Sequence, residues 1–219
     1  MNFRKFAFVI VVFGLICFAY FSYFVYNVML VSNTAFESKQ AFIYIKSNSE
    51  YNQVREDLLP LINDIKTFDI LAKQKKYINN VKAGRYIIEK NMTNNDIINT
   101  IRSKNIPITV SFNNQNSLEK LAKRISMQIE ADSLSLINAF RDSLFLNSNG
   151  FNNENILAMY LPNSYDFFWN TSAVKFRSKI QKEYNKFWNL KRRTKAKNLR
   201  MSPVEVSILA SIVQEESKE

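Results

Sequence analysis

Glu216 is the side chain in this sequence whose surroundings most resemble those of a catalytic acid. Residues 203–219 have the spacing of an amphipathic helix. At about 100° per residue, its apolar residues share one broad face, and Glu216 projects from near the centre of that face; these residues are Val206, Ile208, Leu209, Ile212 and Val213. Apolar surroundings disfavour an ionised carboxylate and raise its pKa. A Glu in that position could act as a general acid near neutral pH.

The start of this helix is well defined by its sequence. Ser202 to Glu205 has the form of a capping box, with Pro203 at the first helical position. The cap accounts for Glu205, and Glu215 falls at the edge of the apolar stripe. For Glu216 the alternative is a solvated carboxylate in a fraying last turn. The residues alone favour that alternative.

Composition excludes several kinds of chemistry. The chain has 219 residues, a net charge of +11, no His and a single Cys, Cys17. Without His there can be no His-based triad, base or metal ligand. One Cys cannot make a disulfide framework or a Cys-rich zinc site within the chain. We therefore expect no cofactor and no metal.

The N-terminal segment is predicted to anchor the chain in a membrane. The 26 residues 6–31 carry no charge and follow Arg4 and Lys5. As a helix they would measure roughly 39 Å, more than the ~30 Å hydrocarbon core. A cleaved signal peptide is the alternative, but its apolar region would be shorter and would end in a small-x-small site. The positive-inside rule then places residues 1–5 in the cytoplasm and the chain after about Ser32 outside.

A basic cluster occupies residues 191–197 and Arg200. Such a cluster invites a nucleic-acid interpretation, but the predicted export of this part of the chain argues against it. Anionic phospholipid and anionic wall polymers are partners that fit an exported basic surface. The simplest interpretation, which we favour, is the solvated face of a helix that begins near Thr171.

Residues 32–106 have the pattern of a small α+β module. We predict strands at 41–46 and 86–90, and helices at 50–61, 68–78 and 93–102, with Thr93 opening the last helix. A third strand is predicted at 107–112. The remainder is largely helical, with helices at 117–129 and 132–145.

The segment from Leu161 to Thr171 is rich in aromatic residues and interrupted by turn residues. Two interpretations remain open. It could be a loop that plugs the core, or the wall of a sugar-binding cleft, because flat aromatic faces stack on pyranose rings.

Several of these segments together resemble the endolytic murein transglycosylases of the MltG/YceG type. The resemblance rests on the single N-terminal span, on residues 83–86 (Ala-Gly-Arg-Tyr) and 92–97, on 161–165 (Leu-Pro-Asn-Ser-Tyr), and above all on 210–217 (Ala-Ser-Ile-Val-Gln-Glu-Glu-Ser). The family usually has Pro-Asp-Thr-Tyr where Pro162 to Tyr165 stand. Its Pro-Glu-Gly turn is replaced here by residues 112–116.

The resemblance implies a fold and a set of site residues. The expected fold is α+β: a transmembrane helix (6–31), a small LysM-like module (32–106), and a mainly helical, lysozyme-like catalytic domain (107–219) that is incomplete at its C-terminus. The family's catalytic Glu falls on Glu216, and an earlier Glu of the motif falls on Gln214. Asn163, Tyr165 and Gln214 are the expected substrate-binding residues.

The resemblance also implies a reaction. Glu216 would protonate the glycosidic oxygen between N-acetylmuramic acid and N-acetylglucosamine. It would then take the proton of the muramic acid's own 6-hydroxyl, which closes a 1,6-anhydro ring. The expected partners are peptidoglycan strands and the bacterial cytoplasmic membrane, with peptidoglycan synthases as further candidates and no nucleic acid.

Two other functions stay open at this point. One is a noncatalytic, membrane-anchored peptidoglycan-binding protein, and the other an adhesin for nucleic acid or anionic lipid that acts through the basic cluster. Family members continue beyond the position that corresponds to Glu219. We therefore expect this 219-residue form to be a fragment without catalytic activity.

Overall fold

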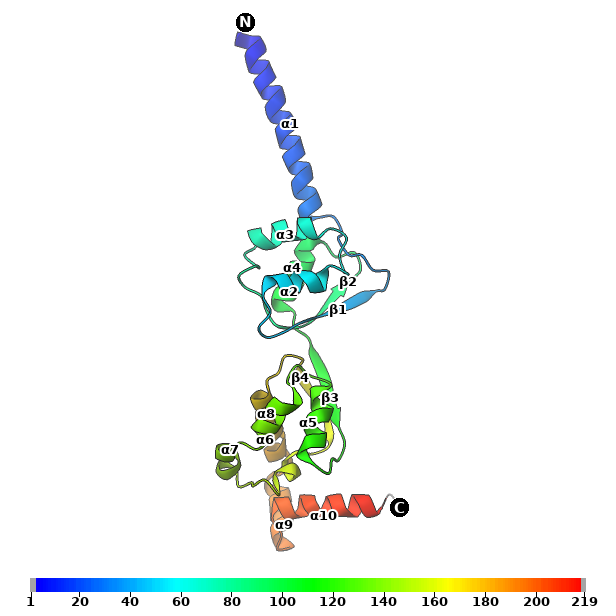
Figure 1. Ribbon diagram of the computed structural model, residues 1–219, viewed down its shortest axis with the longest axis vertical. Coiled ribbons are helices and arrows are strands. Elements are labelled where there is room, and N and C mark those ends of the chain that lie inside the picture. The colour runs from blue at the N-terminus through cyan, green and yellow to red at the C-terminus, as the bar shows by residue number, and fades with distance from the viewer. Residues whose placement is uncertain (1–2, 218–219) are drawn as a thin grey trace. The chain divides into compact units, whose positions relative to one another are not determined.

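The computed structural model describes residues 3–217, so residues 1–2 of the predicted cytoplasmic segment 1–5 and residues 218–219 lie outside the described residues. The fold is mixed α+β and mostly helical, and the described residues contain two small sheets of two strands each. The chain divides into two compact units, Met1–Ile106 and Pro107–Glu219. Figure 1 labels their elements.

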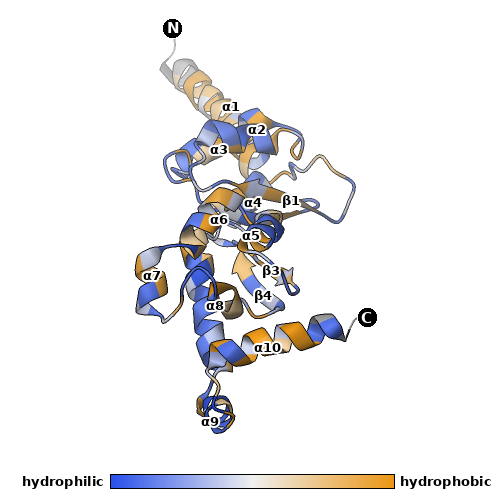
Figure 2. Ribbon diagram, turned by 60° about the horizontal axis from the view of Figure 1, so that its bottom comes forward, coloured by the Kyte–Doolittle hydropathy of each residue, from blue (hydrophilic) through white to orange (hydrophobic). Residues whose placement is uncertain are grey.

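The first unit begins with a long apolar helix, α1 (Phe3–Met29). Its segment Ala7–Met29 is long and apolar enough to cross a membrane, and none of the most apolar 18-residue stretch within it is buried inside the protein. The hydropathy colouring of Figure 2 shows the same continuous apolar stretch. The prediction of one N-terminal apolar helix of spanning length is thereby confirmed.

The rest of the first unit packs three helices against a two-stranded sheet. Strands β1 (Gln40–Ile45) and β2 (Gly84–Glu89) pair antiparallel, with Ile43 opposite Tyr86. Alternate side chains of both strands point into the core, as a half-buried sheet requires. The helices are α2 (Tyr51–Leu58), α3 (Ile65–Gln74) and α4 (Asn94–Ser103). The core side chains include Ile45, Ile88, Val54, Leu58, Phe68, Leu71, Ile97, Ile98 and Ile101.

Gly84 is required at the start of β2. Its φ of +153° lies in a region that L side chains rarely adopt, and a Cβ there would come within 2.5 Å of the Asn105 side chain. That side chain accepts a hydrogen bond from the backbone N–H of Arg85 (3.0 Å). The Ala-Gly-Arg-Tyr segment therefore has a local structural reason for its glycine.

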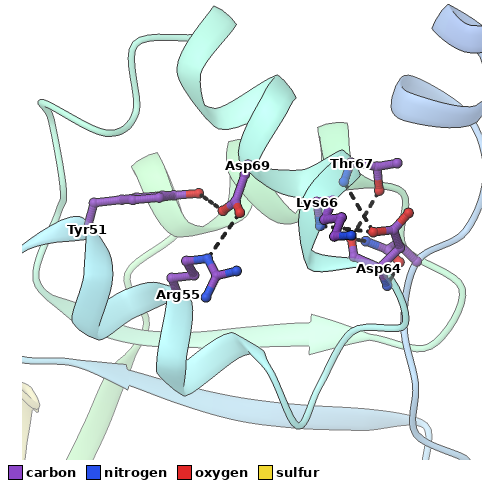
Figure 3. Close-up of polar contacts among 7 residues, drawn as sticks. Tyr51, Arg55, Asp64, Lys66, Thr67 and Asp69 are labelled. Atoms are coloured by element: carbon purple, nitrogen blue, oxygen red, sulfur yellow. Dashed lines mark hydrogen bonds and ion pairs between the residues drawn. The ribbon is translucent and has the colours of Figure 1, made fainter.

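One helix of the first unit begins earlier than the sequence predicts. The helix expected from Phe68 starts at Ile65, because Asp64 caps it by accepting hydrogen bonds from the N–H groups of Lys66 (2.9 Å) and Thr67 (3.3 Å). The Thr67 hydroxyl instead donates to the Asp64 carbonyl (3.0 Å). Figure 3 shows this cap.

The second unit also has a two-stranded antiparallel sheet, formed by β3 (Pro107–Phe112) and β4 (Asn163–Phe168). The predicted strand 107–112 is found. Within the described residues of this unit, up to 217, there are also six α-helices and a short 3-10 helix. They are α5 (Leu118–Ser126), α6 (Ser133–Phe140), α7 (Ser143–Ser148), η1 (Ile156–Met159), α8 (Ala173–Phe187), α9 (Leu190–Asn198) and α10 (Pro203–Glu216).

Two helix predictions in the second unit were wrong. The helix expected over 132–145 is two helices, because α6 ends at Phe140 and Asp142 starts a new cap by accepting from the N–H groups of Leu144 and Phe145. The basic cluster does not continue the helix from Thr171. That helix, α8, ends at Phe187, and the cluster forms its own helix, α9, which Asn189 caps.

Candidate functional site

The first turn of α10 is held by the predicted capping box. The carboxylate of Glu205 accepts a hydrogen bond from the backbone N–H of Ser202 (2.7 Å), and the Ser202 hydroxyl accepts one from the N–H of Glu205 (3.2 Å). The hydrogen bonds from the backbone and side chain of Ser202 lower the pKa of Glu205 below its ordinary value. Glu205 is thus a structural carboxylate, as the sequence indicates.

Glu216 is the last residue of α10, and its side chain is exposed. The expected burial among apolar neighbours is not found. Val204 and Val206 pack against the core of the second unit, but after this first part the helix leaves that core. Ile208 is 43% exposed and Ile212 54%. Figure 2 shows this apolar band on α10.

Glu216 nevertheless lines a large cleft in the second unit. The cleft has a volume of about 1230 Å³, which exceeds the 300–1,000 Å³ range of ordinary small-molecule pockets. Its lining comes from α10, from residues 112–116 after β3, from residues 154–162 around η1, and from the end of α8 with α9. An open cleft of this size suits an extended polymer better than a small metabolite.

Gln214 lines the cleft together with Glu216 and contacts the opposite wall. Its side-chain oxygen accepts a hydrogen bond from the Asn114 amide. Asn114 belongs to the Asn-rich segment that stands where related sequences have a Pro-Glu-Gly turn. This segment therefore reaches the end of α10 and forms part of the same site.

Asn163 and Tyr165 lie outside the cleft lining. Both belong to β4, which the sequence suggested only as an aromatic-rich segment. Tyr165 is 9% exposed, stacks on Phe112 (5.7 Å between ring centroids) and donates its hydroxyl to the Leu161 carbonyl (2.7 Å). Burial raises its pKa, so the phenol stays protonated. Asn163 is exposed, and its side-chain oxygen accepts from the Ser164 N–H (2.8 Å).

Tyr165 can therefore reach the cleft only through its neighbours. Leu161 and Pro162, which precede β4, do line the cleft. The hydrogen bond from Tyr165 to Leu161 and its stacking on Phe112 fix two parts of the cleft wall from behind. The strand therefore fills the core, and from this segment Leu161 and Pro162 line the cleft while its aromatic residues do not.

Three aromatic residues of the cleft, Tyr160, Phe187 and Trp188, were missed by sequence reasoning. Tyr160 and Trp188 line it, and the Tyr160 hydroxyl and the Trp188 indole N–H are buried without a hydrogen-bond partner among the described residues. Burial raises the pKa of Tyr160 well above its ordinary value. Trp188 follows the end of α8, and an aromatic residue directly after a helix is the only signal that could have indicated it.

Cations predominate among the charged side chains around the cleft. Lys120, Arg192 and Lys195 line it, against Glu154 and Glu216. The Arg192 guanidinium lies 4.2 Å from the centroid of the Phe187 ring and donates to the Phe187 carbonyl (2.8 Å). The basic helix α9 thus contributes to the cleft instead of being only a solvated face.

Within residues 3–217 no group of three or more His, Cys, Asp or Glu side chains is placed to hold a metal ion. The groups that line the cleft are carboxylates, amides, hydroxyls, ammonium and guanidinium groups, and aromatic rings.

The cleft thus has a carboxylate at the end of one wall helix, with amide and aromatic groups around it. The chain matches the model of the YceG-like family over residues 43–219 and belongs to that family. The family resemblance found in the sequence is thereby confirmed.

Other comparisons add little to this assignment. No curated protein matches the chain. Among solved structures it is similar to a putative YceG-like protein from Listeria monocytogenes, with 19% sequence identity and a TM-score of 0.43 over 76% of this chain and 61% of that one. The chain thus spans 61% of the length of that relative.

Proposed function

We propose that this protein is a membrane-anchored lytic transglycosylase that cleaves peptidoglycan strands endolytically, with Glu216 as its acid and base. Membership of the YceG-like family, which is the murein transglycosylase family, supports the general activity. The observation that carries the proposal is the place of Glu216: it lies in the cleft wall on α10, in the Gln-Glu-Glu-Ser segment that resembles the family's catalytic motif.

The mechanism needs only one carboxylate. Protonated Glu216 donates its proton to the oxygen between N-acetylmuramic acid and N-acetylglucosamine, and the C1–O bond breaks as positive charge develops at C1. The ionised Glu216 then accepts the proton of the muramic acid's 6-hydroxyl while that oxygen bonds to C1. The carboxyl group is restored and the new end is a 1,6-anhydro ring. Ordinary glycosidases need a second carboxylate because water or the enzyme supplies the nucleophile.

The other cleft groups suit a glycan strand. Asn113 to Asn116 and Gln214 offer amide donors and acceptors for sugar hydroxyls, and Phe187, 41% exposed, offers aromatic surface. Lys120, Arg192 and Lys195 add positive charge, which fits the carboxylates of peptidoglycan. In this proposal Asn163 acts only outside the cleft lining. Tyr165 acts by positioning Leu161 in the cleft wall.

The membrane segment fits a cell-wall role. We propose that α1 crosses the bacterial cytoplasmic membrane once, with residues 1–5 in the cytoplasm and the two units outside, as Lys5 and Arg4 favour. In this arrangement residues 32–106 are the LysM-like module and 107–219 form part of the lysozyme-like catalytic domain. Strands leaving a peptidoglycan synthase would then be close to the cleft.

The test replaces Glu216 by Gln at the gene's own locus, so that the protein is studied as the organism makes it. The amide cannot donate a proton to the glycosidic oxygen. We expect glycan strands to lose all of the 1,6-anhydro ends that deletion of the gene removes, as measured by mass spectrometry of muramidase digests. Glu183→Gln, on α8 and away from the cleft, is the matched control. Normal anhydro ends in Glu216→Gln cells with normal protein levels would reject Glu216 as the acid.

A noncatalytic wall-binding function is the second candidate, favoured by one observation on the first unit. The outer face of the β1–β2 sheet carries Phe42 and Tyr44, which are 40% and 44% exposed, and the Arg85 guanidinium lies 4.2 Å from the Phe42 ring centroid. Exposed rings of this kind can stack on sugars. If binding is the whole function, Phe42→Ala with Tyr44→Ala should abolish retention on isolated peptidoglycan and reproduce the deletion phenotype, while Glu216→Gln should not.

A further inference from the structure

The apolar helix α1 does not end in a free linker; its last turn is part of the core of the first unit. Val28 is 3% exposed and belongs to the cluster that contains Phe68 and Ile97. The buried Asn94 amide donates to the Val28 carbonyl (3.0 Å). Carbonyl groups in the last turn of a helix have no hydrogen-bond partner within the helix, and Asn94 supplies one for the carbonyl of Val28.

A second buried amide continues the same connection. Asn33, 5% exposed, donates both to the side-chain oxygen of Asn94 (2.6 Å) and to the Asp64 carbonyl (2.9 Å). Its own side-chain oxygen accepts from the Asp64 N–H (2.8 Å). The residues that follow α1 are thus tied to the beginning of α3, and the helix and the unit move together.

This connection fixes how far the unit can lie from a bilayer. Tyr23 and Tyr26 are exposed on α1, five and two residues before Val28, and Tyr favours the membrane interface. At 1.5 Å per residue they lie about 3–8 Å along the axis from Val28. If α1 crosses the bilayer, the lipid headgroups therefore reach the surface of the first unit where α1 enters it.

Helix α3 lies at the end of the first unit where α1 enters it. It contacts α1, and Figures 1 and 3 both place it toward α1, with strands β1 and β2 on the opposite side of the unit. Phe68, Leu71 and Ala72 point into the core. At 100° per residue, the opposite face of α3 carries Lys66, Ile70 and Lys73.

The exposed face of α3 is cationic with an apolar centre. Lys66 and Lys73 are exposed, and Ile70 is 43% exposed. The acid of this helix, Asp69, is turned toward α2, where it accepts from the Tyr51 hydroxyl (2.6 Å) and pairs with Arg55 (3.0 Å), as Figure 3 shows. Asp64 is engaged in capping α3 itself. The two Lys around Ile70 give this face a positive charge that is attracted to anionic membrane surfaces.

We propose that this α3 face, Lys66, Ile70 and Lys73, docks on the anionic phospholipid headgroups of the membrane that α1 spans. The Lys ammonium groups pair with headgroup phosphates, and Ile70 enters the apolar boundary between them. The docked face, together with the clamped end of α1, holds the first unit flat against the bilayer. The inference rests on α1 spanning a membrane and is independent of the cleft and of Glu216.

A fluorescence experiment on the whole chain in nanodiscs tests this. In a Cys17→Ser background, an environment-sensitive dye is attached at Gln74→Cys, beside the α3 face, or at Gln40→Cys on β1 as the control. Quenching by headgroup-labelled lipid is compared in phosphatidylglycerol and phosphatidylcholine nanodiscs. We expect about threefold stronger quenching of the α3 probe in the anionic discs, since headgroup attraction acts within a Debye length of ~10 Å, and no difference for the β1 probe.

Charge variants complete the test. Lys66→Glu with Lys73→Glu should remove the extra quenching of the α3 probe, and the milder Lys66→Gln with Lys73→Gln should reduce it, with unchanged circular dichroism in both. High salt should weaken the quenching in the wild-type chain. Equal quenching of the α3 probe in anionic and neutral discs, or quenching that survives both charge variants, would overturn the proposal.

Discussion

Helices α4 and α10 begin with the same kind of cap but differ in what covers them. In α4 the hydroxyl of Thr93 accepts from the Asp96 N–H (3.2 Å), and the Asp96 carboxylate accepts from the Thr93 N–H (3.1 Å). In α10 Ser202 and Glu205 make the equivalent pair. Ile97, Ile98 and Ile101 of α4 are fully buried, whereas Ile208 and Ile212 of α10 are about half exposed.

The difference shows that local sequence signals and burial are separate properties. A capping box and a 3.6-residue apolar period specify that a helix forms and where it starts. Whether its apolar face is buried depends on which other segments pack on it. For α4 the sheet and α3 supply that cover, and for α10 the described residues cover only the first turns. The carboxylate at the end of α10 is exposed for the same reason.

The largest expected contrast comes from removing one Ile in each helix. Ile101→Ala in α4 should lower the free energy of unfolding of the first unit by about 2–5 kcal/mol, because it leaves a cavity in a closed core. Ile212→Ala in α10 should change that of the second unit by less than about 0.5 kcal/mol, as an exposed substitution does. Hydrogen exchange with mass spectrometry in denaturant resolves the two units. Similar costs at both positions would mean that α10 is covered in solution.

Two Asn residues give a smaller contrast. Asn94→Ala removes the donor to the Val28 carbonyl and the partner of Asn33, both buried, so the first unit should lose about 1–3 kcal/mol. Asn114→Ala removes an exposed contact with Gln214 and should cost less than about 0.5 kcal/mol. Exchange of the amides at residues 28–34 reports the first effect. If those amides stay protected in Asn94→Ala, the clamp on α1 is not held by this side chain.

The smallest effect is a pH dependence confined to the start of α10. The pKa of Glu205 is lowered in the folded chain by hydrogen bonds from Ser202. The contribution of the cap is therefore complete above the ordinary Glu pKa and is lost as the pH falls through the lowered value. Protection factors of the first turn of α10 should fall in acid below the ordinary value of 4.5, while α4 keeps its protection through its buried Ile residues.

Replacement of the capping serine checks the origin of that dependence. Ser202→Ala should reduce the protection of the same amides at neutral pH by about 1 kcal/mol and flatten their response to acid. A response that stays unchanged in Ser202→Ala would assign it to another group.

The sequence predicted the elements whose signals are local. The Thr93 and Ser202 caps and the strand 107–112 are found as expected. Strand β4 was missed because its partner β3 lies far away in the chain, and because turn residues among its aromatics suggested a loop or a cleft wall. The break between α6 and α7 depends on Asp142, whose carboxylate also pairs with the buried Arg177 (3.0 Å), a contact that no local pattern contains.

The candidate site was predictable to a similar extent. The family resemblance indicated both Gln214 and Glu216, and both line the cleft, although helical spacing points the two side chains to different faces of α10. It could not show that Tyr165 turns into the core, because that depends on its pairing in β4 and its stacking on Phe112. Trp188, Tyr160 and Asn114 reach the cleft only through the packing of η1, α8 and α10, so their sequence positions carry no signal of it.

The central claim, that Glu216 drives cleavage without water, is tested most directly by the chemistry of the new chain ends. The protein is purified from the membranes of the organism that makes it and incubated with peptidoglycan in heavy-oxygen water, and the released fragments are weighed by mass spectrometry. We predict muramic acid ends that are one water lighter than hydrolysis products and carry no heavy oxygen, and no such ends with Glu216→Gln. Ends that contain heavy oxygen, or unlabelled anhydro ends that persist in Glu216→Gln, would contradict the account.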